Sequence, residues 1–187
     1  MFRRTGLLVV ALLVATGFAT VSAASAAPVS SSASASAPYC GIGWGSQEKA
    51  AATAATTPRV LTNIRAGRHD CYDRLVFDVR GGNFSFYDVK YVTTVKHSDG
   101  RVVPLRGGAK LSITVQASDY DLAGWTAYRY ANRAELVNVS GYPTFRQVAW
   151  ADSDRNTTSF GLGVRARLPF RAFMLPGRIV VDVAHAW

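Results

Sequence analysis

The chain contains few of the residues on which catalytic and metal sites are most often built. Its 187 residues include two cysteines, Cys40 and Cys71, and three histidines, His69, His97 and His185. It has no Gly-x-Ser-x-Gly motif, which marks the nucleophile of many serine hydrolases. No two histidines have the short spacing of zinc ligands, and Asp182 and His185, three residues apart on a predicted strand, face opposite sides. The sequence therefore predicts a non-catalytic protein without metal or cofactor, with a small hydrolase as the alternative.

Acidic residues are scarce as well, with 12 Asp and Glu against 21 Lys and Arg and a net charge of +9. Two pairs, Asp119 with Asp121 and Asp152 with Asp154, lie two residues apart in predicted loops. A glycosidase needs two carboxylates roughly 5–9 Å apart across a cleft, whereas close pairs in turns are typical of solvated loop acids. Asp152 and Asp154 also lack the glycine and bidentate glutamate of a known calcium loop. These acids are therefore predicted to be structural.

Long apolar runs are missing except at the N-terminus. There Arg3 and Arg4 precede an apolar segment over residues 6–21, and Ala24-Ser25-Ala26 matches a small-x-small cleavage site. The apolar segment is shorter than the roughly 20 residues that a membrane-spanning helix needs. Residues 1–26 are therefore predicted to be a secretory signal peptide, and no stable membrane span is expected after its cleavage. An uncleaved membrane anchor is the alternative.

Export determines which partners are expected. Without residues 1–26, 19 Lys and Arg face 12 Asp and Glu, a net charge of +7. A basic protein outside the cell meets wall polymers and anionic lipid headgroups rather than nucleic acid, although a merely soluble basic surface explains the charge equally well. An even number of cysteines in an oxidising compartment favours a Cys40–Cys71 disulfide over two free thiols. We expect a secreted or cell-wall-associated protein.

Two segments precede the main domain. Residues 27–38 are rich in Ala, Ser and Pro, which is typical of a disordered linker. Residues 39–58 begin with Tyr39-Cys-Gly-Ile-Gly-Trp-Gly-Ser46 and are predicted to form an arm tied to the domain by the disulfide. Because Ser46 suits a helix N-cap and alanines follow it, one helical turn is expected over residues 46–50.

The remaining residues, 59–187, show the pattern of one all-β domain. In the clearest strand, Phe160, Leu162 and Val164 alternate with Gly161 and Gly163, as expected when one face is buried. Strands are predicted at residues 59–66, 72–79, 86–95, 101–105, 110–118, 134–139, 144–151, 157–168, 170–175 and 178–184. Short strands at this spacing, separated by Gly, Asn and Pro turns, favour an antiparallel β-sandwich or barrel. Residues 119–131 are predicted to be a long loop.

One phrase occurs twice in the domain. Arg74-Leu-Val-Phe-Asp-Val79 is echoed by Arg178-Ile-Val-Val-Asp-Val183. Within each copy, Arg74 and Asp78, or Arg178 and Asp182, lie four residues apart and share one face of their strand. If the two strands are neighbours, cross-strand Arg–Asp pairing is the favoured role, and ligand binding is the alternative.

Two basic and aromatic groups are candidates for ligand binding. The predicted loop carries Trp125, Tyr128, Arg129 and Tyr130. Aromatic rings stack on sugar faces, and arginine binds carboxylates or phosphates; the alternative is that these rings plug one end of the sandwich. Arg165 and Arg167, with Arg171 close behind, form a second basic group.

Several motifs in the same order resemble the AMIN-like domain family, secreted bacterial proteins related to the amidase N-terminal (AMIN) domain. They are residues 64–79 around Arg-His-Asp-Cys-Tyr-Asp-Arg-Leu-Val-Phe-Asp-Val, then residues 103–109, 145–150, 162–171 and 178–185. The resemblance covers residues 40–187. It implies a β-sandwich of two antiparallel sheets. It also implies a non-catalytic module that holds enzymes or secretion pores at the envelope through peptidoglycan.

The sequence and the resemblance together lead to one functional expectation. The protein is expected to be a secreted, non-catalytic binding module that recognises peptidoglycan or another anionic wall polymer. The alternatives are a docking partner of another envelope protein, a small cell-wall hydrolase, and a carrier whose strands enclose an apolar ligand.

Overall fold

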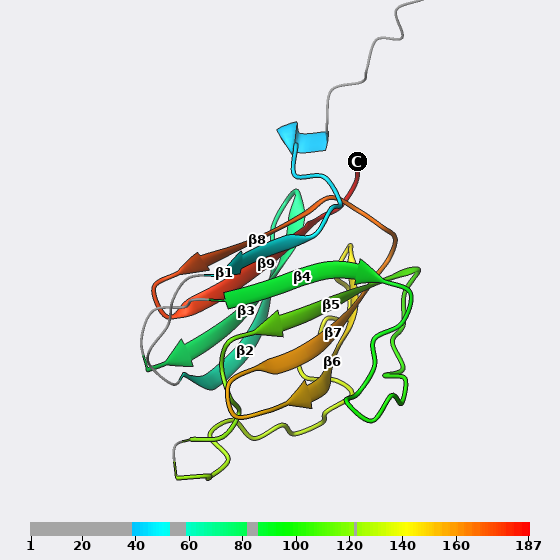
Figure 1. Ribbon diagram of the computed structural model, residues 1–187. Helices are drawn as coiled ribbons and strands as arrows, with labels where there is room; N and C mark the ends of the chain where they lie inside the picture. The colour runs from blue at the N-terminus through cyan, green and yellow to red at the C-terminus, as the bar shows by residue number, and fades with distance from the viewer. Residues whose placement is uncertain (1–38, 53–58, 82–85, 122) are drawn as a thin grey trace, which may run out of the picture. The chain divides into compact units, whose positions relative to one another are not determined.

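The computed structural model describes residues 39–52, 59–81, 86–121 and 123–187. The predicted signal peptide and linker, residues 1–26 and 27–38, lie outside these ranges, as does the end of the predicted arm, residues 53–58. The described residues form nine β-strands and one short 3-10 turn, Tyr39–Gly41, which confirms the all-β class (Figure 1). None of their segments is a helix of the length and apolar character that a membrane crossing requires.

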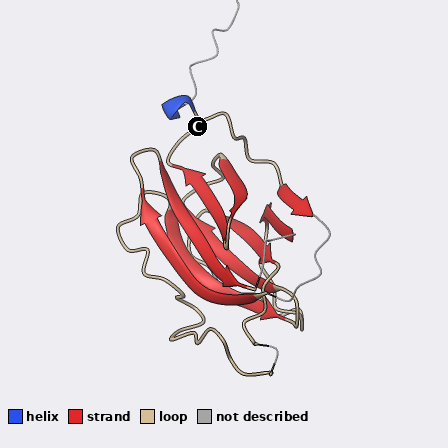
Figure 2. Ribbon diagram, turned by 90° about the vertical axis from the view of Figure 1, so that its left-hand side faces the viewer, coloured by secondary structure: helices blue, strands red, loops and turns tan. Residues whose placement is uncertain are grey.

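The strands form two antiparallel sheets that lie in two layers (Figure 2). The five-stranded sheet has the order β1 (Lys49–Ala52), β4 (Phe86–Val92), β5 (Ala109–Val115), β7 (Thr158–Val164) and β6 (Phe145–Ser153). The four-stranded sheet has the order β2 (Val60–Arg68), β3 (Tyr72–Arg80), β9 (Arg178–Ala184) and β8 (Phe170–Leu175). The expected two-sheet sandwich is therefore confirmed.

Side chains from both sheets fill the space between the layers. Leu75, Phe77 and Val79 alternate along β3 and point into the core, because successive residues of a strand face opposite sides. Phe77 stacks on Phe160 of β7 with ring centroids 4.7 Å apart, which joins the two layers at their centre. A core filled in this way gives the carrier alternative no support.

Three local predictions of secondary structure were wrong. In each case, contacts with residues far away in the sequence determine the conformation instead. The first is the helical turn at residues 46–50, where Lys49–Ala52 instead forms the edge strand β1. Its backbone pairs with β4 in the register Lys49 to Val89. Backbone pairing to an existing sheet edge thus outweighs the modest helix propensity of the alanines.

The second is the strand predicted at residues 101–105, which makes a single isolated bridge, Lys96 to Val102. This segment instead crosses the outer face of the five-stranded sheet, where Val95 and Val103 pack on Ala149 and Ala151. Gly161 and Gly163 of β7 make the crossing possible, because a Cβ at Gly163 would collide with the backbone oxygen of Arg106.

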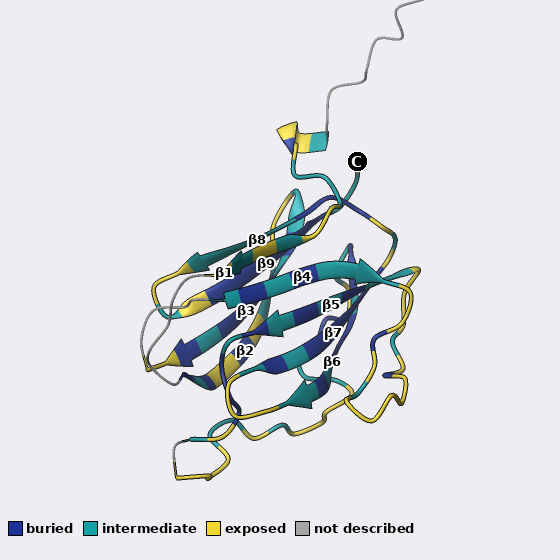
Figure 3. Ribbon diagram, viewed as in Figure 1, coloured by how far each residue is buried: buried dark blue, intermediate teal, exposed yellow. Residues whose placement is uncertain are grey.

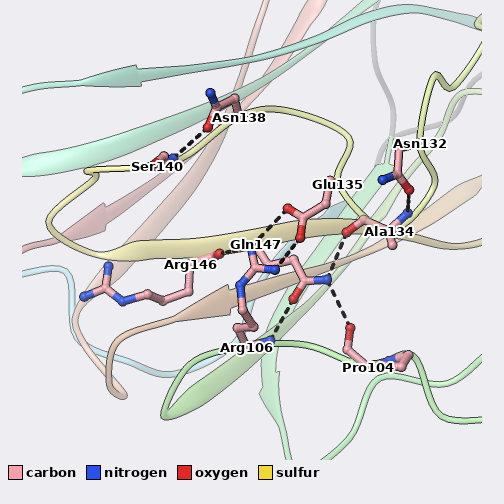
Figure 4. A network of polar contacts seen from close by, with 9 residues as sticks. All are labelled: Pro104, Arg106, Asn132, Ala134, Glu135, Asn138, Ser140, Arg146 and Gln147. Atoms are coloured by element: carbon pink, nitrogen blue, oxygen red, sulfur yellow. Dashed lines mark hydrogen bonds and ion pairs between the residues drawn. The ribbon is translucent and has the colours of Figure 1, made fainter.

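The third is the strand predicted at residues 134–139, which is irregular and is held by side chains (Figure 4). Gln147 of β6 donates to the carbonyl oxygens of Ala134 at 2.9 Å and Pro104 at 3.3 Å. Glu135 forms an ion pair with Arg106. Backbone pairing with β6 is limited to the bonds from Leu136 N–H to Val148 and from Trp150 N–H to Arg133, so these side-chain bonds supplement an incomplete ladder.

Candidate functional site

The outer face of the four-stranded sheet carries most of the polar side chains that the sheet contributes to the surface. The register places Arg171, Asp182 and Arg74 next to one another across β8, β9 and β3. Two positions from the Arg74–Asp182 pair, Val76 of β3 lies opposite Val180 of β9. Two positions beyond that, Asp78 of β3 lies opposite Arg178 of β9. The repeated phrase therefore runs antiparallel to itself, and each arginine meets the aspartate of the other copy. We call Arg65, Arg74, Arg171 and Arg178, with Asp78 and Asp182, the arginine face.

Asp182 is the centre of the first half of this face. Its side chain is fully buried and accepts from Arg74 Nε at 2.7 Å, from Arg74 Nη2 at 2.9 Å and from Arg171 Nε at 2.8 Å. The bond to Asp182 raises the pKa of the Arg74 guanidinium, against the opposing effect of burial. A two-pronged arginine–carboxylate contact fixes geometry as well as charge, so both guanidinium groups are held in position.

Asp78 is the centre of the second half and is more exposed. It accepts from Arg65 Nε at 2.8 Å and Arg65 Nη2 at 3.2 Å, and Arg178 Nε lies 3.5 Å away. The side chains of Arg65 and Arg178 are 47% and 52% exposed. The bond to Asp78 raises the pKa of Arg65. Each aspartate thus lies between two arginines, so each half of the face has a net charge of +1.

The middle of the face is apolar but covered. Val76 and Val180 are 3% and 1% exposed although their side chains leave the core side of the sheet. Arginine side chains bury their aliphatic stems on such surfaces and keep the charged end in water. The arginines of this face therefore have a packing role in addition to their charge.

Aromatic rings border the Asp182 half. The Arg171 guanidinium lies 4.3 Å from the ring centroid of Trp44 and 5.1 Å from that of Phe173. Arg74 lies 5.3 Å from the ring of Tyr72, on which His69 stacks at 4.6 Å. The disulfide Cys40–Cys71, present as predicted, ties the segment that carries Trp44 to the start of β3. The site thus combines arginines with rings suited to stacking on sugars.

The aromatic residues predicted in the long loop lie elsewhere. Trp125 is 75% exposed, in a turn where its backbone N–H donates to Asp121 at 2.8 Å. The segment around it is largely exposed (Figure 3). Tyr128 and Tyr130 pack against the core, and burial raises the pKa of both hydroxyls. Arg129 is exposed. Tyr128 and Tyr130 thus have packing contacts, whereas Trp125 and Arg129 are exposed.

The predicted pair Arg165 and Arg167 lies beyond the opposite end of β7. Arg165 donates to the carbonyl oxygen of His185, and Arg167 donates to Ser46 at 3.1 and 3.2 Å and lies 4.8 Å from the ring of Tyr91. The loop that carries Trp125 follows β5 in the chain. The last residue of β5, Val115, pairs with Thr158, so this loop begins at the start of β7. The seven residues of β7, six steps along the strand, span roughly 20 Å between the two groups. The structure therefore does not bring the two predicted groups into one site.

The acidic and histidine residues considered for catalysis have structural contacts. Asp121 and Asp154 accept backbone N–H groups within their own turns. Burial acts to raise the pKa of Asp154, but hydrogen bonds from Asn156 and Thr157 outweigh it and lower the pKa. Asp73, fully buried, accepts from the backbone of Thr144 and Phe145 and lies 3.1 Å from His185. Among the described residues, no three His, Cys, Asp or Glu side chains are grouped to hold a metal ion.

Sequence reasoning did not connect Arg65 or Arg171 with the repeated Arg–Asp phrase, and it did not place Trp44 beside the arginine face. Arg65 and Arg171 reach Asp78 and Asp182 from strands outside the repeated phrase, so no local motif marks them. Trp44 reaches the face from the arm. One signal for Arg171 was present in the sequence. Arg171, Phe173 and Leu175 alternate with Ala172 and Met174, which predicts that Arg171 lies on the outer face of the sheet.

Comparisons with known proteins give a single match. A family model described as "AMIN-like domain" matches residues 59–185. No curated protein and no solved structure matches the chain.

Proposed function

Because the chain belongs to the AMIN-like domain family, we propose that it is an exported, non-catalytic module that binds an anionic polymer of the cell envelope. The proposed ligand is peptidoglycan or an anionic wall glycopolymer, and the proposed binding surface is the arginine face. Family membership supports the envelope location and the binding role. The positive charge supports the choice of an anionic partner.

One observation carries this proposal: two aspartates share four arginines on an exposed sheet face. Each carboxylate has two arginine partners, so each half of the face carries one positive charge more than its aspartate neutralises. The surplus positive charge can be neutralised by carboxylates or phosphates of a partner. Guanidinium groups suit both, because their planar N–H fork matches the oxygen pairs of these anions.

The spacing of the two halves suits a chain rather than a small ion. Arg74 and Asp78 are four residues apart on β3, which places the two halves roughly 13 Å from each other. A polymer with repeating anionic groups can contact both halves at once, and simultaneous contacts raise the effective affinity. Trp44 and Phe173 offer ring surfaces for the sugar units at one border.

The test is co-sedimentation of the purified protein with insoluble cell-wall sacculi. We expect the double variant Arg65→Gln/Arg178→Gln to sediment several-fold less than the wild type, because it removes two exposed guanidinium groups from the face. The matched control is Arg129→Gln/Arg155→Gln, which loses the same net charge from exposed residues outside the face. Equal sedimentation of the two double variants would contradict a role of the arginine face.

Two further measurements identify the ligand and test for the competing activity. Sacculi stripped of phosphate-containing glycopolymers by acid distinguish peptidoglycan from those polymers. Soluble sugar or peptide fragments released in the same tube would instead support the hydrolase alternative. Binding should weaken as salt is raised from 50 to 500 mM, since the Debye length falls from about 14 Å to about 4 Å over that range.

A further inference from the structure

We propose that a second site, on the opposite sheet from the arginine face, binds a small organic carboxylate. The site is a pocket of about 360 Å³ between β6 and two neighbouring segments, residues 97–104 and residues 133–134. Its lining includes His97, Arg101, Val103, Pro104, Arg133 and Trp150. A volume of this size is within the range of ligand pockets and suits a small molecule or the end of a peptide.

The ionisable side chains that line this pocket are all basic. Two arginines and one histidine line it, and its described lining contains no Asp or Glu. Arg101 forms an ion pair with Asp99 at 2.6 Å. Arg133 has no carboxylate partner among the described residues; its guanidinium lies 4.2 Å from the ring centroid of Trp150 and 5.7 Å from that of Tyr130. Stacking occupies the flat side of the guanidinium and leaves its N–H edge available to an anion.

The pocket is held in shape by contacts of its own walls. Gln147, 6% exposed, donates to the carbonyl oxygens of Ala134 and Pro104 and accepts from the Arg106 backbone N–H at 2.8 Å (Figure 4). His97 Nδ1 lies 2.5 Å from the carbonyl oxygen of Ala151, which fixes that nitrogen as the donor and leaves Nε2 unused by this contact. A pocket fixed in advance loses less entropy when a ligand binds.

Trp150 adds a donor that lacks an acceptor. Its indole Nε1–H is buried and makes no hydrogen bond to the described residues. Buried N–H groups are almost always paired in folded proteins, so one left without an acceptor at a pocket wall calls for an explanation. The Arg133 guanidinium covers this ring, and we infer that it shifts on binding so that an oxygen of the carboxylate reaches the indole N–H.

The chemistry of the lining selects the ligand class. One unpaired guanidinium matches one carboxylate, and the apolar walls Val103 and Pro104 with the Trp150 ring match a small apolar body. We therefore assign a mono-carboxylate with an apolar substituent. It can be a free small acid or the C-terminal residue of a peptide, which share this chemistry.

The experiment follows the Trp150 indole N–H by ¹H–¹⁵N NMR while ligand is added to the purified protein. The probes are N-acetylalanine and its uncharged amide, N-acetylalaninamide, with propionate as the free small acid. We expect both acids to shift the Trp150 resonance and the amide to leave it in place. Tighter binding of N-acetylalanine than of propionate assigns a peptide end, and equal binding assigns a free acid.

Two variants test the role of Arg133. Arg133→Gln should weaken N-acetylalanine binding by about tenfold or more, the usual scale for a lost charge-assisted hydrogen bond. Arg129→Gln, an exposed arginine of the same loop outside the pocket, should bind like the wild type. Equal shifts by the acid and its amide would overturn the proposal, and that comparison needs only the wild type. The outcome is independent of sacculus binding, since Arg133 and Trp150 are not part of the arginine face.

Discussion

Asp182 and Asp78 hold the same position in the repeated phrase but have different surroundings. Asp182 is fully buried between Arg74 and Arg171, whereas the Asp78 side chain is 22% exposed between Arg65 and Arg178. Removing one partner from a buried ion pair leaves the other charge unpaired, which costs far more than loss of a surface pair. The two aspartates thus provide a matched comparison at the scale of single residues.

We predict that Asp182→Asn lowers the free energy of unfolding by about 3 kcal/mol, because two guanidinium groups lose their shared carboxylate. Asp78→Asn should lower it by no more than about 1 kcal/mol. Urea denaturation of both variants and the wild type measures the difference. Equal losses in the two variants would show that burial does not set the strength of these contacts.

Gly163 offers a second prediction at this scale. A Cβ there would collide with the backbone oxygen of Arg106, which cannot move without shifting the crossing segment. We expect Gly163→Ala to destabilise the protein by about 3 kcal/mol, as overpacking does in tight cores. The control is Gly43→Ala, since a Cβ at Gly43 meets nothing within 4 Å. Thermal or urea unfolding checks both, and a wild-type midpoint for Gly163→Ala would contradict the packing argument.

At the scale of elements, the sequence predicted strands well wherever alternation was strong. Eight of the ten predicted strands are present, including β7, whose alternation of Phe160, Leu162 and Val164 with glycines was the clearest. The failures at residues 101–105 and 134–139 involve segments held by contacts to Gly161, Gly163 and Gln147. Such contacts join residues that are far apart in the chain, so a local pattern carries no trace of them.

The candidate site, too, was predictable from the sequence only in part. The Arg–Asp phrases were visible in the sequence, and their pairing depended on whether β3 and β9 are neighbours. The participation of Arg65 and Arg171 depends on β2 and β8, and it could not be foreseen without the sheet order. For the aromatic loop residues, composition alone does not separate Tyr130, which packs against the core, from the exposed Trp125.

The disulfide that ties the N-terminal arm to the domain gives a prediction at the scale of elements. Cys40 and Cys71 are 31 residues apart and join the arm to β3. Replacing both by Ser should cost about 3 kcal/mol by restoring the entropy of the open loop in the unfolded chain. Hydrogen exchange should also quicken at β1, because residues 42–48 connect this short strand to the disulfide. Unchanged exchange in β1 would show that its pairing with β4 is sufficient to hold the arm.

At the scale of the whole molecule, buried tyrosines make stability depend on alkaline pH. Burial raises the pKa of Tyr87, Tyr91, Tyr128 and Tyr130. Hydrogen bonds of Tyr87 to the carbonyl of Ala172 and of Tyr91 to that of Leu168 connect β4 of one sheet with β8 and the residues before it. The protonated hydroxyls therefore help to join the two sheets.

The sign of the effect follows from the raised pKa values. An unfolded tyrosine loses its proton near pH 10, while the folded protein still holds it, so unfolding is favoured as the pH rises. We predict constant tyrosine-linked stability below about pH 9 and a steep loss above about pH 10. Urea midpoints from pH 8 to 11 measure this dependence. Tyr130→Phe should make the loss shallower, and an identical slope would remove Tyr130 from this explanation.

The antiparallel pairing of the repeated phrase gives the arginine face an approximate twofold axis. The axis passes between Val76 and Val180, which are directly opposite each other. Rotation about it exchanges β3 with β9 and brings Arg74 and Asp182 onto Arg178 and Asp78. The outer strands follow this symmetry only in charge, because Asn63 lies opposite Asp78 where Arg171 lies opposite Asp182, and Arg65 reaches Asp78 from the next outward position of β2. The two central strands thus present the same sequence of charges from either end, Arg74 and Asp182 at one and Arg178 and Asp78 at the other. Under the proposed function, a polymer strand would therefore contact this surface equally well in either polarity, and binding would not depend on the direction in which the strand runs.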